Sequence, residues 1–324
     1  MPHSVNQARC PLFPKAKYRV KNWSEYDQAL QERGSLTLWV TPEALAAWRA
    51  LPTGKRGRSR SYSDLAIETG HLLRLVFGRP WRQTEGLLRS ITALLGVSLA
   101  IPDHTTFSRR SAALSLPTTR RPSSEPVHVV LDSTGLKVYG VGEWQREKHG
   151  GRGRRTWRKL HLAVNPDNSE ILASELTTNE VGDLSMVRPL LDQIPGEMTS
   201  ILADGAYDGE PVYRAIAERQ PQRPPVVVIP PRVTAVLSPG AEALPSLRDQ
   251  HIQIMQEKGR RGWQKAVGYG KRSLVETAMF RYKTLIGPQL RARTLATQKT
   301  EARIACSVIN RMMQLGRPIS ERIR

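Results

Sequence analysis

Hydrophobic positions in the first third of the chain recur at intervals of three and four residues. This spacing runs through residues 23–33, 64–77 and 82–95, and it places the apolar side chains of each run on one helix face. The runs are followed by Gly34, Gly78 and Gly96, and glycine is common just past the end of a helix. We therefore predict three amphipathic helices.

Shorter helices are predicted from their starting residues. Thr41 can cap a helix in which Pro42 takes the first position, and Asp103 can cap another through residues 104–110. Residues 35–40 alternate between polar and apolar side chains, which predicts an extended segment.

The helices over 64–77, over 82–95 and after Asp103 follow one another as in a helix-turn-helix bundle. In that interpretation the last helix enters the major groove of DNA, and Thr105, Ser108 and Arg109 contact bases or phosphates. The alternative is a small bundle that only packs against the next domain.

The hydrophobic period changes after residue 126. Apolar runs predict strands over 128–131, 159–164, 170–176, 200–203 and 226–229. Helices are predicted over 183–194, over 211–219 and around Glu276. This order predicts an α/β fold, with a mixed sheet flanked by helices and preceded by an all-helical N-terminal region.

A proline- and serine-rich stretch at 116–126 predicts a domain boundary. The predicted parts are a basic arm at 1–22, a helical DNA-binding domain at 23–120, an α/β domain at 126–315 with a short insertion at about 231–265, and a basic tail at 316–324.

Charge is the unusual feature of the composition. The 324 residues include 49 Lys and Arg against 29 Asp and Glu, a net charge of +20, whereas 39% hydrophobic residues are ordinary for a globular protein. Such an excess favours a polyanionic partner, and nucleic acid is the usual one. A ribosome-associated or merely basic protein is the alternative.

Cysteine usage and hydropathy exclude several classes. Cys10 and Cys306 lie far apart without nearby histidines, so neither a disulfide framework nor a zinc site is indicated. No apolar run is long enough to cross a bilayer, so we expect a cytoplasmic, nucleoid-associated protein without a membrane partner.

Three acidic residues form the candidate chemistry. Asp132 and Asp204 each follow a predicted strand, and Glu276 lies on the late helix. If the strands are neighbours, the three carboxylates converge and cannot all stay ionised without cations. Oxygen ligands of this kind favour Mg²⁺ or Mn²⁺. Taken singly, each aspartate is more often a turn former, and the glutamate more often half of an exposed ion pair.

A polar stripe surrounds Glu276. At about 100° per residue, Tyr269, Arg272 and Lys283 fall within roughly 40° of Glu276 on one helix. Cations beside a carboxylate suit metal-assisted phosphoryl chemistry.

With these residues the chain resembles bacterial insertion-sequence transposases that have a ribonuclease-H-like core and an Asp-Asp-Glu triad, and it is most similar to the insertion-sequence-five type. The pattern Tyr-x2-Arg-x3-Glu-x6-Lys matches at Tyr269, Arg272, Glu276 and Lys283. The Asp-Gly-x-Tyr pattern matches at Asp204, and Asp132-Ser-Thr-Gly-Leu-Lys and the following Trp157-Arg-Lys-Leu-His161 also look like that family. The resemblance covers roughly residues 60 to 315.

The resemblance implies an enzyme that binds terminal inverted repeats, cleaves DNA at the element ends and joins the freed 3′ hydroxyl to target DNA. Asp132 would bridge two Mg²⁺ or Mn²⁺ ions, and Asp204 and Glu276 would each complete one coordination shell. Arg272 and Lys283 would hold phosphates, and Tyr269 would orient the strand or simply fill a core edge. A homodimer on DNA is expected from the family.

A basic loop is predicted between the first two strands. It includes Arg146, Lys148, Arg152, Arg154, Arg155, Arg158 and Lys159, interleaved with Trp144 and Trp157. Such a loop suits DNA binding, although the tryptophans are equally suited to anchor it on the core. His161 is expected to be structural.

Two other functions remain open from the sequence. The protein could be a catalytically silent DNA-binding regulator that keeps the fold, or a nuclease of the same fold that cuts without joining. The terminal repeat, the target preference and the pathway of transposition are not predicted.

Overall fold

The computed structural model describes residues 17–52, 54, 60–114, 125–138 and 157–323. The chain divides into two compact units. One comprises Met1–Leu38 with Arg311–Arg324, and the other comprises Trp39–Asn310. No helix in the described ranges combines the length and the apolar character needed to cross a membrane.

The smaller unit pairs the two ends of the chain. Strand β1 (Lys17–Val20) runs antiparallel to β8 (Ser320–Ile323), and helix α2 (Trp23–Glu32) follows β1. The Asn22 side chain donates to the Arg317 carbonyl at 3.0 Å and accepts from the Ile319 amide at 2.7 Å. One amide side chain therefore fixes the C-terminal segment beside α2.

The larger unit begins with a helical bundle. It contains α4 (Pro42–Ala46), α5 (Asp64–Val76), α6 (Trp81–Leu94) and α7 (His104–Ser111), after the short helix α3 (Leu36–Trp39). The predicted caps are confirmed, since the side chains of Thr41 and Asp103 accept from the amides of Ala44 and Thr106.

The extended segment expected at residues 35–40 is wrong, because α3 forms there. The adjacent residues Trp39 and Val40 are both buried. A strand would point neighbouring side chains to opposite faces, whereas a helical turn can bury both.

A mixed sheet confirms the predicted α/β class. Its order is β4-β3-β2-β5-β6, with β7 beside β2. The strands are β2 (Val127–Val138), β3 (Trp157–Val164), β4 (Ile171–Thr178), β5 (Met198–Leu202), β6 (Val226–Val228) and β7 (Gln289–Leu290). Strands β2, β3 and β4 are antiparallel, while β5 and β7 run parallel to β2 and β6 parallel to β5.

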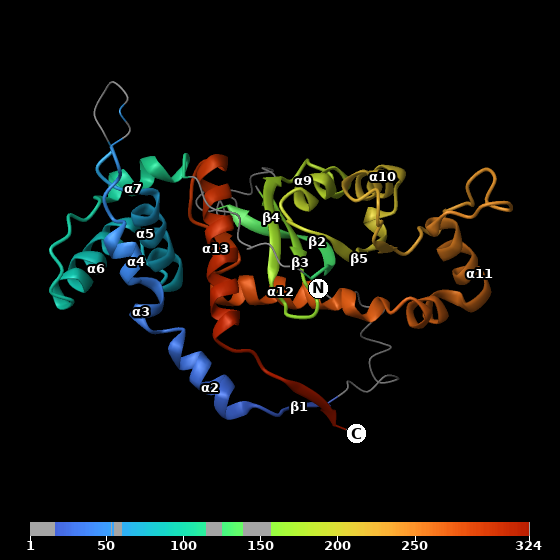
Figure 1. Ribbon diagram of the computed structural model, residues 1–324, viewed down its shortest axis with the longest axis horizontal. Helices are drawn as coiled ribbons and strands as arrows, with labels where there is room; N and C mark the ends of the chain where they lie inside the picture. Colours follow the sequence, from blue (N-terminus) through green and yellow to red (C-terminus); the bar gives the residue numbers. More distant parts are fainter. Residues whose placement is uncertain (1–16, 53, 55–59, 115–124, 139–156, 324) are drawn as a thin grey trace, which may run out of the picture. The chain divides into compact units, whose positions relative to one another are not determined.

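Helices cover both faces of this sheet (Figure 1). Helices α9 (Val187–Leu191) and α10 (Glu210–Arg219) lie on one face, and α12 (Ser273–Leu285) lies on the other. Val129, Leu131 and Ile201 pack in the α9–α10 core. Since side chains alternate along a strand, Asp132 belongs to the opposite face, with α12.

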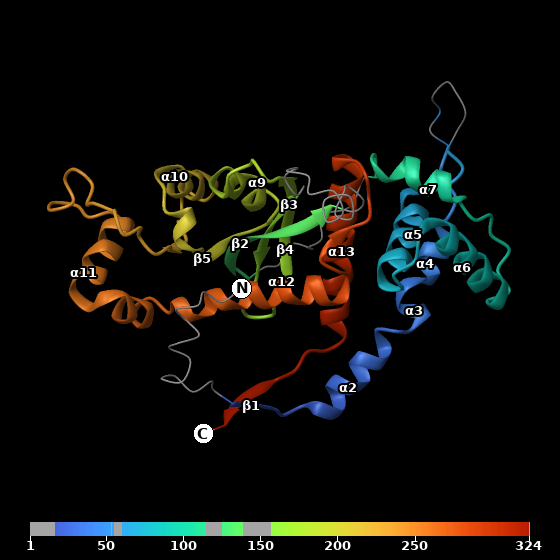
Figure 2. The ribbon, with the colours of Figure 1, turned by 180° about the vertical axis from the view of Figure 1, so that it is seen from behind.

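Two long helices were not expected from the sequence. Helix α11 (Leu247–Ala266) fills much of the expected insertion and starts with a capping box between Ser246 and Asp249. Helix α13 (Leu295–Leu315) lies between the bundle and the sheet (Figure 2). The Asn310 side chain makes two 2.8 Å hydrogen bonds to the backbone of Ile171, which joins α13 to edge strand β4.

Candidate active site

Asp132 lies within a strand, so its expected position at a strand end is wrong. Strand β2 continues to Val138 because β3 pairs with it as far as Lys137 and β7 pairs with its last two residues. The side chain of Asp132 is 13% exposed.

Asp204 lies beside Asp132 on the neighbouring strand. Val130 of β2 is in register with Leu202 of β5, and the two aspartates each come two residues later. The carboxylate of Asp204 accepts from the Ala206 amide at 2.9 Å and caps the short 3₁₀ helix η3 (Gly205–Tyr207). A pair distant in sequence is therefore brought to one level of the sheet.

Arg272 connects all three acidic side chains. It ends the 3₁₀ turn η4 (Tyr269–Arg272), which leads into α12. One guanidinium nitrogen is 2.7 Å from Asp132 and 3.6 Å from Asp204, and the other contacts Glu276. The three predicted carboxylates thus converge on a single cation.

Burial and charge set the protonation of this cluster. Burial raises the pKa of Asp132 to about 6, while Arg272 and the Ser133 amide oppose the rise. Burial alone would lower the pKa of Arg272, but the carboxylates of Asp132 and Glu276 raise it above its ordinary value. The cluster holds three acidic groups against one guanidinium, so it favours further positive charge.

Tyr269 anchors the start of this segment. Its hydroxyl donates to the Ala203 carbonyl at 3.3 Å, and its ring packs on Trp263 with centroids 5.0 Å apart. Burial raises its pKa. Tyr269 therefore holds η4 against the end of β5, next to Asp204.

The family models decide the class of protein. A model described as the transposase DDE domain matches residues 123–311, and a second model of the same description matches residues 31–141. The chain belongs to the DDE transposase family. The first match includes Asp132, Asp204 and Glu276.

Two solved transposase structures show only low similarity to this transposase. The piggyBac transposase synaptic complex with hairpin DNA has 12% identity and a TM-score of 0.36, over 92% of this chain and 77% of that one. The Mos1 transposase paired-end complex with left transposon end has 11% identity and a TM-score of 0.22, over 87% and 90%. Scores this low do not define a shared fold.

The three carboxylates of the transposase site surround a guanidinium. Across the part of the chain that the structure describes, no three His, Cys, Asp or Glu side chains are arranged to hold a metal ion. The guanidinium lies among the three carboxylates, so their oxygens face a cation already. The donor set itself, three carboxylates, fits a hard divalent ion.

The other predicted contacts of the transposase lie in different places. Thr105, Ser108 and Arg109 are exposed on α7, and Lys283 is half-buried two turns beyond Glu276. Arg158 donates to the Gln298 side chain at 2.9 Å, and Lys159 donates to the Val181 carbonyl at 3.0 Å. Arg154 and Arg155, like the loop residues Trp144, Arg146, Lys148 and Arg152, lie outside the described residues.

The structure also tests the expected role of His161 and the helix predicted from residue 183. His161 is fully buried and its Nε2 pairs with the Thr177 hydroxyl at 2.9 Å, which confirms a structural role. The helix predicted over 183–194 is shorter than expected, since Asp183 starts the 3₁₀ turn η2 (Asp183–Met186) and α9 follows it, and the Asp183 carboxylate lies 3.4 Å from Lys159.

Asp208 is a supporting residue that the sequence did not indicate. It lies in the segment after Asp204, its side chain is fully buried, and Arg248 of α11 pairs with it at 2.7 Å. The Arg232 amide also donates to Asp208 at 2.9 Å. A partner 40 residues away gives no local pattern, so only the folded chain reveals this link.

Proposed function

We propose that this protein is a DNA transposase of the insertion-sequence-five type, with a ribonuclease-H-like core. It would bind terminal inverted repeats, cleave phosphodiester bonds at the element ends and join the freed 3′ hydroxyl to target DNA. The observation that carries the proposal is the contact of one Arg272 guanidinium with Asp132, Asp204 and Glu276.

The sheet supports the proposed core. Asp132 lies in β2 and Asp204 lies two residues beyond the end of the adjacent parallel strand β5, in the middle of the sheet, and Glu276 comes from the helix on the same face. Strands and a packed helix hold side chains more precisely than loops do, as metal-ion catalysis requires.

Two divalent metal ions are part of the proposal. Asp132, Asp204 and Glu276 would hold them, and Mg²⁺ or Mn²⁺ when bound supplies activation of a water and stabilisation of the departing 3′ oxygen. The same carboxylates now balance the charge of Arg272. When metal ions neutralise these carboxylates instead, the Arg272 guanidinium would bind a phosphate of the DNA.

The remaining residues of the stripe would position DNA. Lys283 lies seven residues after Glu276 on α12, about 10 Å along the helix axis, and would contact a neighbouring phosphate. Tyr269 would act indirectly, by holding η4 against β5.

Charge supports double-stranded DNA as the partner. A net charge of +20 attracts a polyanion, and phosphate contacts release condensed counterions. Thr105, Ser108 and Arg109 on α7, together with Arg158 and Lys159, are the proposed contacts in the described part of the chain. Since two element ends must be cut together, the proposed assembly on DNA is a homodimer.

The first test replaces each acidic residue without changing its size. Asp132→Asn, Asp204→Asn and Glu276→Gln should lower Mg²⁺-dependent nicking of a labelled end fragment by on the order of a hundredfold or more, because each removes a ligand charge. Affinity for the same fragment should stay unchanged or rise.

A matched control is Asp192→Asn, which removes an exposed carboxylate of α9 that pairs with Arg188. It should nick like the unchanged protein. Full nicking by one of the three test variants would remove that residue from the proposed metal site. Absence of nicking by the folded, unchanged protein would favour the silent regulator, and cut products that never join target DNA would favour the nuclease.

A further inference from the structure

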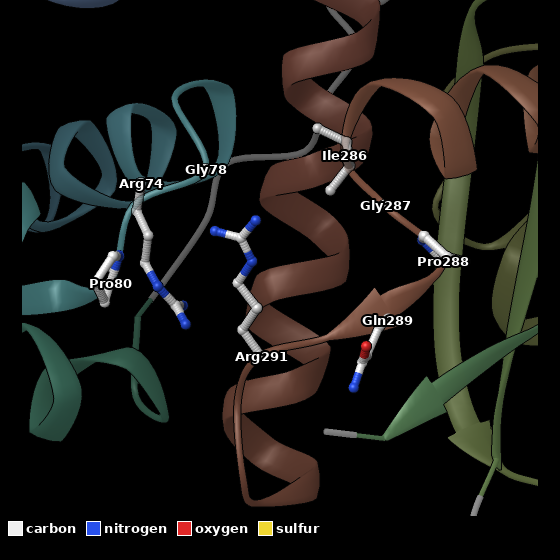
Figure 3. A pocket seen from close by; sticks show the side chains of 8 residues that line it. All are labelled: Arg74, Gly78, Pro80, Ile286, Gly287, Pro288, Gln289 and Arg291. Atoms are coloured by element: carbon white, nitrogen blue, oxygen red, sulfur yellow. The ribbon is translucent and has the colours of Figure 1, made fainter. Parts of the chain in front are cut away.

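A cleft in the larger unit shares no residue with the carboxylate cluster of Asp132, Asp204 and Glu276. It has a volume of about 740 Å³ and lies between α7 and the segment 291–297, which runs from the end of β7 into the first turn of α13. We call it the arginine cleft, since Arg74, Arg109, Arg291 and Arg293 line it. A cavity of about 490 Å³ adjoins it and shares Arg74 and Arg291, which both extend into the space between the bundle and α13 (Figure 3).

The arginine cleft carries unbalanced positive charge. Its lining contains the four arginines but no Asp or Glu. Arg74 is balanced by Glu301 at 3.6 Å, and both side chains are buried. Among the described residues, Arg109, Arg291 and Arg293 have no carboxylate within ion-pair distance. Three cations facing one hollow favour an anion with several charges.

Buried polar atoms in the cleft wall also lack partners. In the described chain the Nε of Arg74 and the Nδ1 of His71 are buried without a hydrogen bond. Arg74 is only 6% exposed. The Nε of Arg74 is a donor, and a buried donor without a partner is costly, so an acceptor brought by a ligand would stabilise this part of the wall. The Nδ1 of His71 is an acceptor instead, because the Nε2 of the same ring donates to the Ser111 hydroxyl, which itself donates to the Phe107 carbonyl.

The aromatic residue of the cleft is already packed. The Trp81 ring stacks on Phe107 at 5.0 Å, meets His71 edge to face at 4.6 Å, and has the Arg74 guanidinium 4.6 Å from its centroid. It therefore offers no open face for stacking a base, and the chemistry of the cleft selects phosphate groups.

The backbone that carries Arg291 and Arg293 is fixed before any ligand arrives. The Glu301 carboxylate accepts from the amides of Arg291 and Ala292 at 2.8 and 2.7 Å, and the Gln298 side chain donates to the Ala292 carbonyl at 3.0 Å. Charges on a preorganised segment bind with less loss of conformational entropy.

We propose that the arginine cleft binds the phosphate backbone of DNA. Helix α7 and the segment 291–297 then contact the same stretch of DNA without reading its sequence. Ser108 supplies a hydroxyl donor on the α7 side, while the Thr105 hydroxyl in the same lining donates to Asp103. This inference rests on DNA being the partner of the proposed transposase.

Strand β2 connects the cavity beside the cleft with the acidic residues. Gln289, in the adjoining cavity, pairs with Lys137 of β2, and Lys137 lies five residues along β2 from Asp132. At about 3.3 Å per residue, Lys137 and Asp132 are roughly 17 Å apart along β2, which is the length of about five base pairs of duplex.

The test measures DNA affinity of the full chain as a function of salt. The probe is a labelled duplex of arbitrary sequence, and the test variant is Arg291→Ala with Arg293→Ala. The control is Arg188→Ala with Arg223→Ala, which removes the same charge from exposed arginines paired with Asp192 and Glu197. We expect the test variant to bind roughly tenfold more weakly, and the slope of log K against log salt to fall by about 0.9 for each lost contact.

Further variants separate a local effect from misfolding. Arg109→Gln, on the exposed face of α7, should lower the slope by about 0.9 alone, and Arg291→Lys with Arg293→Lys should restore it because lysine keeps the charge. If the test variant has unchanged thermal unfolding and binds DNA as tightly as the control, the proposal that the arginine cleft binds DNA is wrong. DNA binding does not require cleavage, so a protein that binds DNA but does not cut it would contradict only the proposed function. A protein that binds no DNA would contradict both the proposed function and the proposed role of the arginine cleft.

Discussion

At the scale of single residues, Arg272 is the side chain on which the acidic cluster depends. It contacts carboxylates from β2, from the end of β5 and from α12, and only 20% of its own side chain is exposed. Three like charges in one place repel each other unless a cation lies among them. The guanidinium therefore keeps Asp132 ionised although burial raises its pKa to about 6.

Removal of this cation should destabilise the fold. Arg272→Ala leaves the largely buried Asp132 without its partner, and we expect a loss of about 1–3 kcal/mol in unfolding free energy. Arg188→Ala, which breaks an exposed pair with Asp192, should change it by less than about 0.5 kcal/mol. Urea denaturation at pH 7.5 measures both. Equal effects in the two variants would show that the guanidinium does not hold the cluster together.

At the scale of elements, close packing of α5 on α7 depends on a missing side chain. A Cβ added to Gly70 of α5 would lie 2.2 Å from Cε1 of Phe107, a fully buried residue of α7. Gly86, in the middle of α6, would meet nothing within 4 Å. The two helical glycines thus have opposite roles, one set by packing and the other only by backbone freedom.

Alanine at these two positions should therefore have effects of opposite sign. Gly86→Ala should stabilise the protein by about 0.5–1 kcal/mol, since alanine is the better helix former. Gly70→Ala should destabilise it by about 1–3 kcal/mol, because Phe107 must shift in a packed core. Thermal unfolding of both variants checks the pair. A stabilised Gly70→Ala would mean that α5 and α7 pack less closely than described.

At the scale of the whole molecule, net charge determines how strongly the protein attracts its partner. The excess of 49 basic over 29 acidic residues produces a long-range attraction for any polyanion. These cations differ in the hydrogen bonds that they already make within the protein. Arg158 and Lys159 already bond protein groups, whereas Arg109, Arg291 and Arg293 face one cleft.

DNA binding by the unchanged protein should consequently weaken steeply with salt. Each phosphate contact adds about −0.9 to the slope of log K against log salt on duplex DNA, so several contacts give a slope of several units. Fluorescence anisotropy between low and physiological ionic strength measures it. A nearly flat response would contradict the role assigned to the basic surface.

The strongest local patterns predicted the elements well. The helices that became α5, α6 and α7, and the capping residue Asp103 of α7, follow from periodicity and side-chain chemistry within one turn. The end of β2 was placed too early, because β3 and β7 extend it through polar residues. Helix α11 was missed since its interior includes the break at Gly259, and α13 since its polar residues, such as Asn310, are buried by distant partners.

The sequence by itself determined the mixed α/β class, the basic charge and the three acidic residues with their signature neighbours. These depend on residue identity and spacing, which local sterics and the hydrophobic effect translate directly into elements. Only the tertiary structure decided that Arg272 lies between the three carboxylates and that arginines from α7 and the segment before α13 face one hollow. Such contacts join residues far apart in the chain, and they form only when strand register and helix packing have fixed the backbone.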